Sequence, residues 1–199
     1  MKTTFKVVIA ALTLSTFVFE GCKKGSNDPF LSLHSRKGRV TGDWTVKSGS
    51  GTNVNGSTTT TWTYDGTTYS QTTGSNTVTN GMTYTMNFEK DGTYKSVQTN
   101  TATGYSDAVT ETGTWNFTGG IGDDKNKDHI VLKTLVSTDV QTIGSSSTTT
   151  TETYTGDDAP VTLYYIDELK NKEMIFTWDG TDTQGSNTSS SKGTFTLQQ

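Results

Sequence analysis

Strict alternation of apolar and polar residues is the feature that most narrowly limits the fold of this chain. From Met82 to Phe88, apolar side chains occupy every second position and threonine or asparagine stands between them. A period of two is typical of a strand with one buried and one exposed face. Lys90-Asp91-Gly92 follows, and Thr93 to Gln98 is again rich in strand-favouring residues. Because Asp-Gly supplies the positive φ values that tight turns require, we predict a β-hairpin here.

Further segments after residue 40 are rich in strand-favouring residues and are separated by turn signals. They are Trp62 and Tyr64 before Asp65-Gly66, Trp115 and Phe117 before Gly119-Gly120, Ile130 to Val136, Val161 to Ile166, Met174 to Trp178, and Thr194 to Leu197. Threonine, the commonest residue, also favours strands, and apolar residues nowhere recur at helical spacing over a useful length. We therefore predict an all-β antiparallel meander of eight to ten strands. Such a sheet tends to curl into a barrel or half-barrel, which we favour over a sandwich.

The first residues have the layout of a secretory signal peptide. Lys2 and Lys6 precede an uncharged stretch from Val7 to Phe19, and Gly21 stands before Cys22. This order of charged, apolar and small residues is typical of an exported precursor. The stretch of about 13 residues is shorter than the roughly 20 that a membrane-spanning helix needs. We expect residues 1–21 to be cleaved off.

Cys22 is the only cysteine, so no disulfide can form within the chain. Its surroundings resemble the lipobox of bacterial lipoproteins, in which this cysteine is lipidated and becomes the new amino terminus. That resemblance implies attachment to a membrane through acyl chains. Phe19 and Glu20 stand where the usual lipobox has leucine and a small residue, and the alternative is an ordinary signal peptide with an incidental cysteine. We predict a flexible tether over residues 22–38 and one barrel domain over residues 39–199.

The order of motifs in this domain resembles that of the lipocalin-like domain lipoproteins of the Gram-negative envelope. The motifs are Gly42-Asp43-Trp44, the hairpin Phe88-x-x-Asp91-Gly92-x-Tyr94, Gly113-Thr114-Trp115 and Asp128-x-Ile130-x-Leu132. The resemblance implies a barrel with Trp44 at its closed end, a small apolar ligand inside, and a location on the outer membrane, at either its periplasmic or its outer face. The final strand, from Gly193 to Gln198, lacks the arginine that lipocalins usually place against that tryptophan.

Aromatic residues are the candidates for ligand contact, because they combine large apolar surfaces with few rotatable bonds. The set that we select consists of Trp62, Tyr64, Tyr84, Phe88 and Trp115. The alternative is that these side chains form the core of a filled barrel. A filled barrel would suit a structural or adhesive surface lipoprotein that binds no small ligand.

Little in the chain points to catalysis, metal binding or nucleic acid. The net charge is −4, whereas phosphate binding requires a basic face. Only His34 and His129 offer imidazole groups, and no zinc-binding spacing of Cys or His is present. Asp124, Asn126 and Asp128 alternate as in a calcium loop, but His129 stands where that loop needs glycine. We expect no catalytic residue, no metal and no cofactor, and the expected partners are the membrane and a small apolar ligand.

Overall fold

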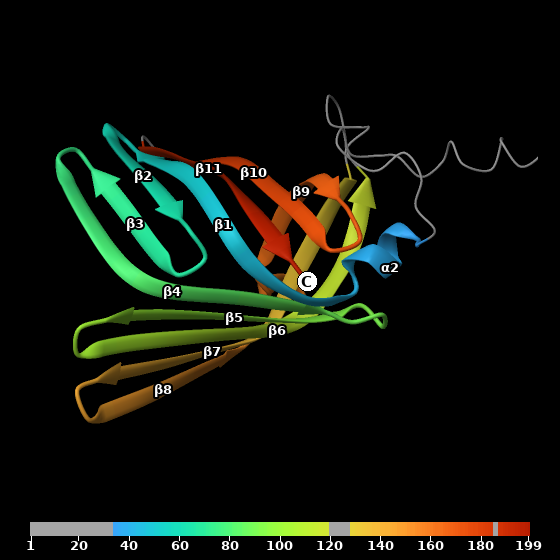
Figure 1. Cartoon of the computed structure of the whole chain (residues 1–199), viewed down its shortest axis with the longest axis horizontal. Helices are drawn as coiled ribbons and strands as arrows, with labels where there is room; N and C mark the ends of the chain where they lie inside the picture. The colour runs from blue at the N-terminus through green and yellow to red at the C-terminus, as the bar shows by residue number, and fades with distance from the viewer. Residues whose placement is uncertain (1–33, 120–127, 185–186) are drawn as a thin grey trace, which may run out of the picture.

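The computed structural model describes residues 34–119, 128–184 and 187–199, which form one antiparallel sheet and two short helices, α2 (Arg36–Val40) and η2 (Gly156–Asp158) (Figure 1). The strands are β1 (Gly42–Asn55), β2 (Thr58–Tyr64), β3 (Thr68–Thr73), β4 (Asn76–Phe88), β5 (Thr93–Ala102), β6 (Tyr105–Gly119), β7 (Asp128–Ile143), β8 (Ser146–Thr153), β9 (Val161–Leu169), β10 (Glu173–Gln184) and β11 (Asn187–Gln198). The predicted all-β fold is confirmed.

Ten of the strands close a ring. Each strand from β1 to β7 pairs with the next, β7 pairs with β9, and β9, β10 and β11 lead back to β1. Strand β8 pairs, within the described residues, only with β7. Residues 42–45 of β1 pair directly with β4, so β2 and β3 separate these two strands only further along the barrel. The structure is thus a closed antiparallel barrel, one of the two forms, barrel or half-barrel, that the meander predicted.

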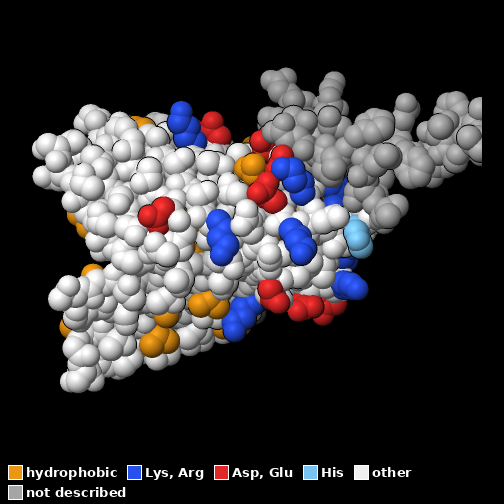
Figure 2. Space-filling view, in the orientation of Figure 1, with side chains coloured by type: hydrophobic (Ala, Val, Ile, Leu, Met, Phe, Trp, Pro, Cys, Tyr) orange, Lys and Arg blue, Asp and Glu red, His pale blue; other side chains and the backbone are white. Residues whose placement is uncertain are grey.

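The two ends of the barrel differ. We call the end that carries α2 and the β9–β10 turn the closed end, and the end formed by the turns at 56–57, 74–75, 103–104 and 144–145 the mouth, which lies at the left of Figure 1. Toward the mouth, β7 pairs with β8 instead of β9, and β10 beyond residue 177 pairs only with β11. Charged side chains gather toward the closed end, whereas the hairpins at the mouth carry mostly uncharged polar residues (Figure 2).

The interior of the closed end is filled by large aromatic side chains. Trp44, Phe88 and Trp115 are at most 2% exposed, and the rings of Phe88 and Trp115 meet edge to face with their centroids 5.6 Å apart. The indole N–H of Trp44 donates to the carbonyl of Val40 at 2.7 Å, and that of Trp115 donates to the carbonyl of Glu89 at 3.0 Å. Burial of each such side chain stabilises the fold by roughly 1.5–3 kcal/mol. Trp44 lies where the lipocalin resemblance placed it.

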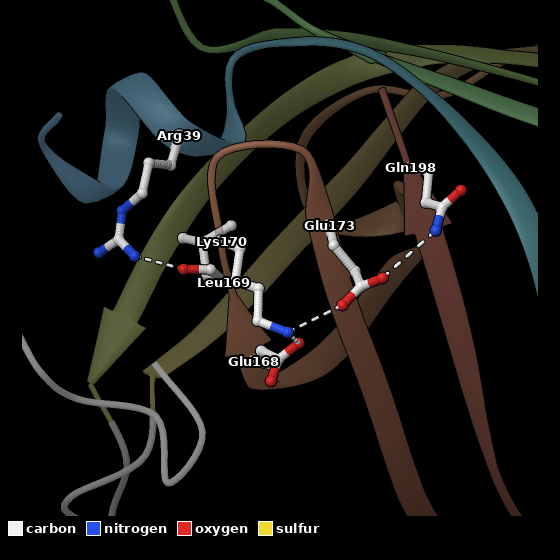
Figure 3. Close-up of polar contacts among 6 residues, drawn as sticks. All are labelled: Arg39, Glu168, Leu169, Lys170, Glu173 and Gln198. Atoms are coloured by element: carbon white, nitrogen blue, oxygen red, sulfur yellow. Dashed lines mark hydrogen bonds and ion pairs between the residues drawn. The ribbon is translucent and has the colours of Figure 1, made fainter. Parts of the chain in front are cut away.

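Helix α2 packs against this closed end. Ser35 caps the helix by accepting a hydrogen bond from the backbone N–H of Gly38 at 3.0 Å. Arg39 and Val40 are buried, and the guanidinium of Arg39 donates to the carbonyl of Leu169 at the end of β9 (Figure 3). The helix starts within the residues predicted as tether. The closed end therefore holds a buried arginine, Arg39, that precedes the first strand, whereas lipocalins usually place an arginine on the last strand.

Polar side chains join three neighbouring strands at the closed end. The ammonium group of Lys170 lies 2.7 Å from a carboxylate oxygen of Glu168 and 3.0 Å from one of Glu173 (Figure 3). Gln198 donates its amide to the other oxygen of Glu173 at 3.2 Å. The hydrogen bond from Lys170, followed by that from Gln198, lowers the pKa of Glu173. These contacts link β9, β10 and β11 where the barrel is closed.

The predicted hairpin between β4 and β5 is confirmed, and Lys90-Asp91-Gly92 forms its turn. Gly92 has a φ of 94°, whereas no described residue other than glycine has a positive φ. The N–H of Gly92 donates to the carbonyl of Glu89 at 3.1 Å, and Asp91 accepts hydrogen bonds from the N–H and hydroxyl of Thr93 at 2.9 and 2.7 Å. The three-residue turn ends in a glycine with positive φ, and the Asp91 side chain stabilises it.

The predicted signal peptide, Cys22 and the first part of the tether lie outside the described residues. In the part of the chain that the structure does describe, neither helix has the length and apolar character needed to cross a membrane.

Candidate ligand-binding site

The candidate site is built on a row of four residues that pair across neighbouring strands of the barrel wall. Gly51 on β1 pairs with Gly193 on β11, Trp62 on β2 pairs with Gly51, and Trp178 on β10 pairs with Gly193. The row therefore reads Trp-Gly-Gly-Trp. Because neither glycine has a side chain, the two indoles can lean toward each other over the backbone of β1 and β11.

The two indoles lie directly on this glycine pair. A Cβ atom added to Gly51 would lie 2.6 Å from Cζ2 of Trp62, and one added to Gly193 would lie 2.4 Å from Cζ2 of Trp178. The ring centroids are 5.8 Å apart and the ring planes differ by 10°. Both rings rest on backbone, and they stack against each other. We call Trp62 and Trp178 the tryptophan platform, which Phe195 extends at 5.6 and 5.0 Å from the two rings.

A cavity of about 450 Å³ lies over the tryptophan platform in the mouth half of the barrel. Its apolar lining consists of Trp62, Tyr69, Met82, Trp178 and Phe195. Its polar lining consists of Asn53, Asn80, Gln98, Asn100 and Ser191. Small-molecule sites in proteins have volumes of roughly 300–1,000 Å³ and combine apolar walls with a few polar groups. This cavity meets both criteria, and none of the described residues that line it carries a charge.

Hydrogen bonds hold the polar lining in place. The indole N–H of Trp178 donates to the hydroxyl of Ser191 at 3.1 Å, and that hydroxyl donates to Oδ1 of Asn53 at 2.8 Å. Across the cavity, Nε2 of Gln98 donates to Oδ1 of Asn100 at 3.4 Å. A side-chain amide can make about four hydrogen bonds, so these contacts orient the amides without using all of their donors and acceptors. The remaining groups are available to a ligand.

A layer of tyrosines separates the cavity from the packed closed end. Tyr84 follows Met82 by two residues along β4, so both side chains point into the barrel. Burial raises the pKa of Tyr164 to about 12 and raises that of Tyr84 well above its usual value, and the carboxylate of Glu111 raises both pKa values further. Tyr94 shares a hydrogen bond of 2.7 Å with Thr134 in the same layer. The phenols therefore stay neutral at physiological pH and can act as hydrogen-bond donors.

The barrel wall has a seam beside the platform. Pairing between β9 and β10 ends at residues 165 and 177, and an outer groove of about 680 Å³ lies along the two strands beyond that point. Val161 and Leu163 line this groove and are 62% and 40% exposed. Trp178 borders both the groove outside and the cavity inside. The platform is thus reached from the mouth and lies next to the seam.

The predicted ligand-contact residues separate into two groups. Trp62 lines the cavity, Tyr64 is buried and donates its hydroxyl to the carbonyl of Met82 at 3.2 Å, and Tyr84 belongs to the tyrosine layer. Phe88 and Trp115 lie in the packed closed end, away from the cavity lining. Of the five residues, Trp62 alone is among the described residues that line the cavity, Tyr64 and Tyr84 lie beneath it, and Phe88 and Trp115 belong to the core of the closed end.

The polar half of the lining was missed at the sequence level. Gln98 and Asn100 continue the inward-facing positions that begin at Tyr94, which the period of two could have revealed. Gly49 and Gly51 alternate in the same way on β1 and are the sequence signal for rings lying against the backbone. Aromatic rings that cover strand glycines are a known way to pack such positions.

The described residues contain no group of three or more His, Cys, Asp or Glu side chains arranged to hold a metal ion. Of the calcium-like run from Asp124, only Asp128 is described, and its carboxylate lies 2.5 Å from the guanidinium of Arg36. His129 is buried against the ring of Tyr165, with centroids 4.5 Å apart.

Comparison of the chain with protein-family models, with curated proteins and with solved structures found no match. The lipocalin-like resemblance therefore rests on the sequence motifs.

Proposed function

We propose that the protein is a lipid-anchored envelope protein whose barrel binds a small molecule in the mouth cavity. The observation that carries the proposal is the cavity of about 450 Å³ over the tryptophan platform. A small barrel with a purely structural role can fill its interior with side chains, as this one does at the closed end. At the mouth, aromatic side chains and oriented amides instead line an open cavity.

The platform is suited to binding because it is rigid before a ligand arrives. The backbone of Gly51 and Gly193 sets how closely the two indoles approach the barrel wall, and the hydrogen bond to Ser191 fixes the side-chain rotation of Trp178. Preorganised groups lose little conformational entropy on binding, which favours affinity. Trp62, Met82 and the other apolar lining residues support the sequence-based expectation of a ligand with substantial apolar surface.

The position of the proposed anchor agrees with this role. The chain enters the barrel through α2 at the closed end, and the mouth lies at the opposite end (Figure 1). A tether from Cys22 would therefore attach the closed end to the membrane side and direct the mouth away from it. The lipocalin-like lipoproteins of the outer membrane remain the family that we propose for the chain.

Replacing Cys22 with Ser tests the anchor. The wild-type protein should sediment with membranes and incorporate radiolabelled palmitate, and the Cys22→Ser variant should do neither. Retention of the variant on membranes would contradict lipid attachment at Cys22.

Native mass spectrometry tests the binding role. The full chain with Cys22→Ser is purified from its own host, and its mass is compared before and after denaturation. We expect a copurified small molecule that is released on unfolding. A clean apo mass would favour the second candidate, a structural or adhesive lipoprotein, to which the fully exposed Ser/Thr-rich strand β8 would then point.

A further inference from the structure

We propose that the ligand of the mouth cavity is a neutral carbohydrate, with a sugar ring lying flat on the tryptophan platform. This inference rests on the proposed binding function and adds the chemical class of the ligand. Three features of the cavity lead to it: the flat aromatic floor, the amide-rich wall and the absence of charge from the lining.

The floor matches the apolar face of a sugar ring. The axial C–H groups of a pyranose form a flat, weakly positive face, and the electron-rich face of an aromatic ring attracts such C–H groups. Trp62 and Trp178 differ by only 10° in orientation, and their centroids are 5.8 Å apart. The stacked indoles give the cavity a flat aromatic floor that suits the C–H face of a sugar ring.

The wall supplies hydrogen-bonding groups at the edge of the platform. Oδ1 of Asn53 accepts from Ser191, and its Nδ2 makes no hydrogen bond to the described residues. The amide of Asn80 also makes none among them, although Asn80 lines the cavity. On strand β5, which pairs with β4 next to Asn80, Asn100 donates to Asp107 at 3.2 Å and accepts from Gln98, which orients both amides. Amides carry donors and acceptors together and can therefore pair with vicinal hydroxyls, which do the same.

The polar lining argues against a purely apolar ligand. Such a ligand would displace water from these amides without replacing its hydrogen bonds, and the unpaired groups would cost affinity. A charged ligand is also disfavoured, since no Lys, Arg, Asp or Glu is among the described residues that line the cavity and could neutralise it. A neutral polyhydroxylated ring can stack on the indoles of the floor and form hydrogen bonds with the amides of the wall at the same time.

Two parallel binding assays test this inference on the full chain with Cys22→Ser. One is an array of immobilised neutral glycans that covers glucans, mannans, galactans, xylans and chitin oligomers. The other is fluorescence titration with the apolar probe N-phenyl-1-naphthylamine. We expect saturable binding to at least one glycan class, competed by the soluble oligosaccharide. Binding of the apolar probe without any glycan would overturn the carbohydrate inference but leave a ligand-binding barrel. Binding of neither would overturn the inference and the proposed function together.

Single substitutions locate the binding site. Asn80→Leu keeps the size of the side chain and removes its amide, and we expect about a tenfold or greater loss of glycan affinity. Gln98→Met does the same on the neighbouring strand β5. Asn116→Leu is the matched control, because Asn116 is exposed on the outer face of β6. Equal glycan affinity in Asn80→Leu, Gln98→Met and Asn116→Leu, all folded by circular dichroism, would contradict binding at this wall.

Discussion

Substitution of Gly193 by Ala tests whether the tryptophan platform is built on the glycine pair. The new methyl group would lie 2.4 Å from Cζ2 and 2.7 Å from Cη2 of Trp178, and 2.9 Å from the carbonyl oxygen of Ser50. A side-chain ring can tilt away, but the backbone oxygen of the neighbouring strand cannot move without disturbing the ladder. Overpacking of this kind typically costs about 1–3 kcal/mol. We expect urea unfolding, followed by tryptophan fluorescence, to show this loss for Gly193→Ala.

Gly180→Ala is the matched control for this prediction. Gly180 lies on the same strand as Trp178, its φ is not positive, and a Cβ atom there would meet nothing within 4 Å. Alanine restricts the unfolded chain more than glycine, so this variant should be neutral or more stable by up to about 1 kcal/mol. Gly193→Ala should also change the near-ultraviolet circular dichroism of the indole pair, and Gly180→Ala should not. Equal stabilities and equal spectra for the two variants would refute the platform geometry.

Three further predictions concern the interior and one turn. Because the pKa values of Tyr84 and Tyr164 are raised in the folded protein, their contribution to the free energy of unfolding is fully present below pH 10 and is lost as the pH rises toward 12. The shift of Tyr164 alone corresponds to about 3 kcal/mol. Absorbance at 295 nm should show these two phenols ionising only as the protein unfolds. Phe88→Ala should cost about 3–5 kcal/mol in urea unfolding, because Phe88 is fully buried at the closed end, and a loss no larger than that of a surface substitution would contradict the packed core. Hydrogen bonds from Thr93 lower the pKa of Asp91. The stabilisation by these hydrogen bonds is therefore present at neutral pH and is lost as the pH falls through the lowered pKa. In thermal melts, Asp91→Ala should be less stable than wild type at pH 7 but not at pH 2.

The strands and their pairing were largely predictable, because they follow from local patterning. The alternation from Met82 to Phe88 and the turn at Asp91-Gly92 identified β4, β5 and their hairpin, and the succession of short turns implied a closed meander. The insertion of β2 and β3 between the far halves of β1 and β4 was not predictable. It depends on which half of a long strand pairs with which neighbour, and a period of two is the same in both halves.

The candidate site was only partly predictable, because alternation tells which face a residue is on but not how far along the barrel it lies. Phe88 and Trp62 both point inward, yet one lies in the packed end and the other lines the cavity. Gln98 and Asn100 were overlooked because polar residues in strands usually face solvent. Nothing in the sequence indicated that Arg39, at the start of the predicted barrel domain, is buried, because its place in the closed end depends on a hydrogen bond to the distant carbonyl of Leu169.

The four tryptophans provide the most direct test of the central claim that a ligand binds over the platform. Trp62 and Trp178 line the cavity, whereas Trp44 and Trp115 are buried at the closed end, so the indole ¹H–¹⁵N signals contain their own control. A mixture of soluble neutral oligosaccharides is titrated into the ¹⁵N-labelled Cys22→Ser chain, with signals assigned by Trp→Phe substitution. We predict saturable shifts of the Trp62 and Trp178 signals while those of Trp44 and Trp115 stay in place. Absence of any shift, or equal shifts of all four signals, would contradict the account.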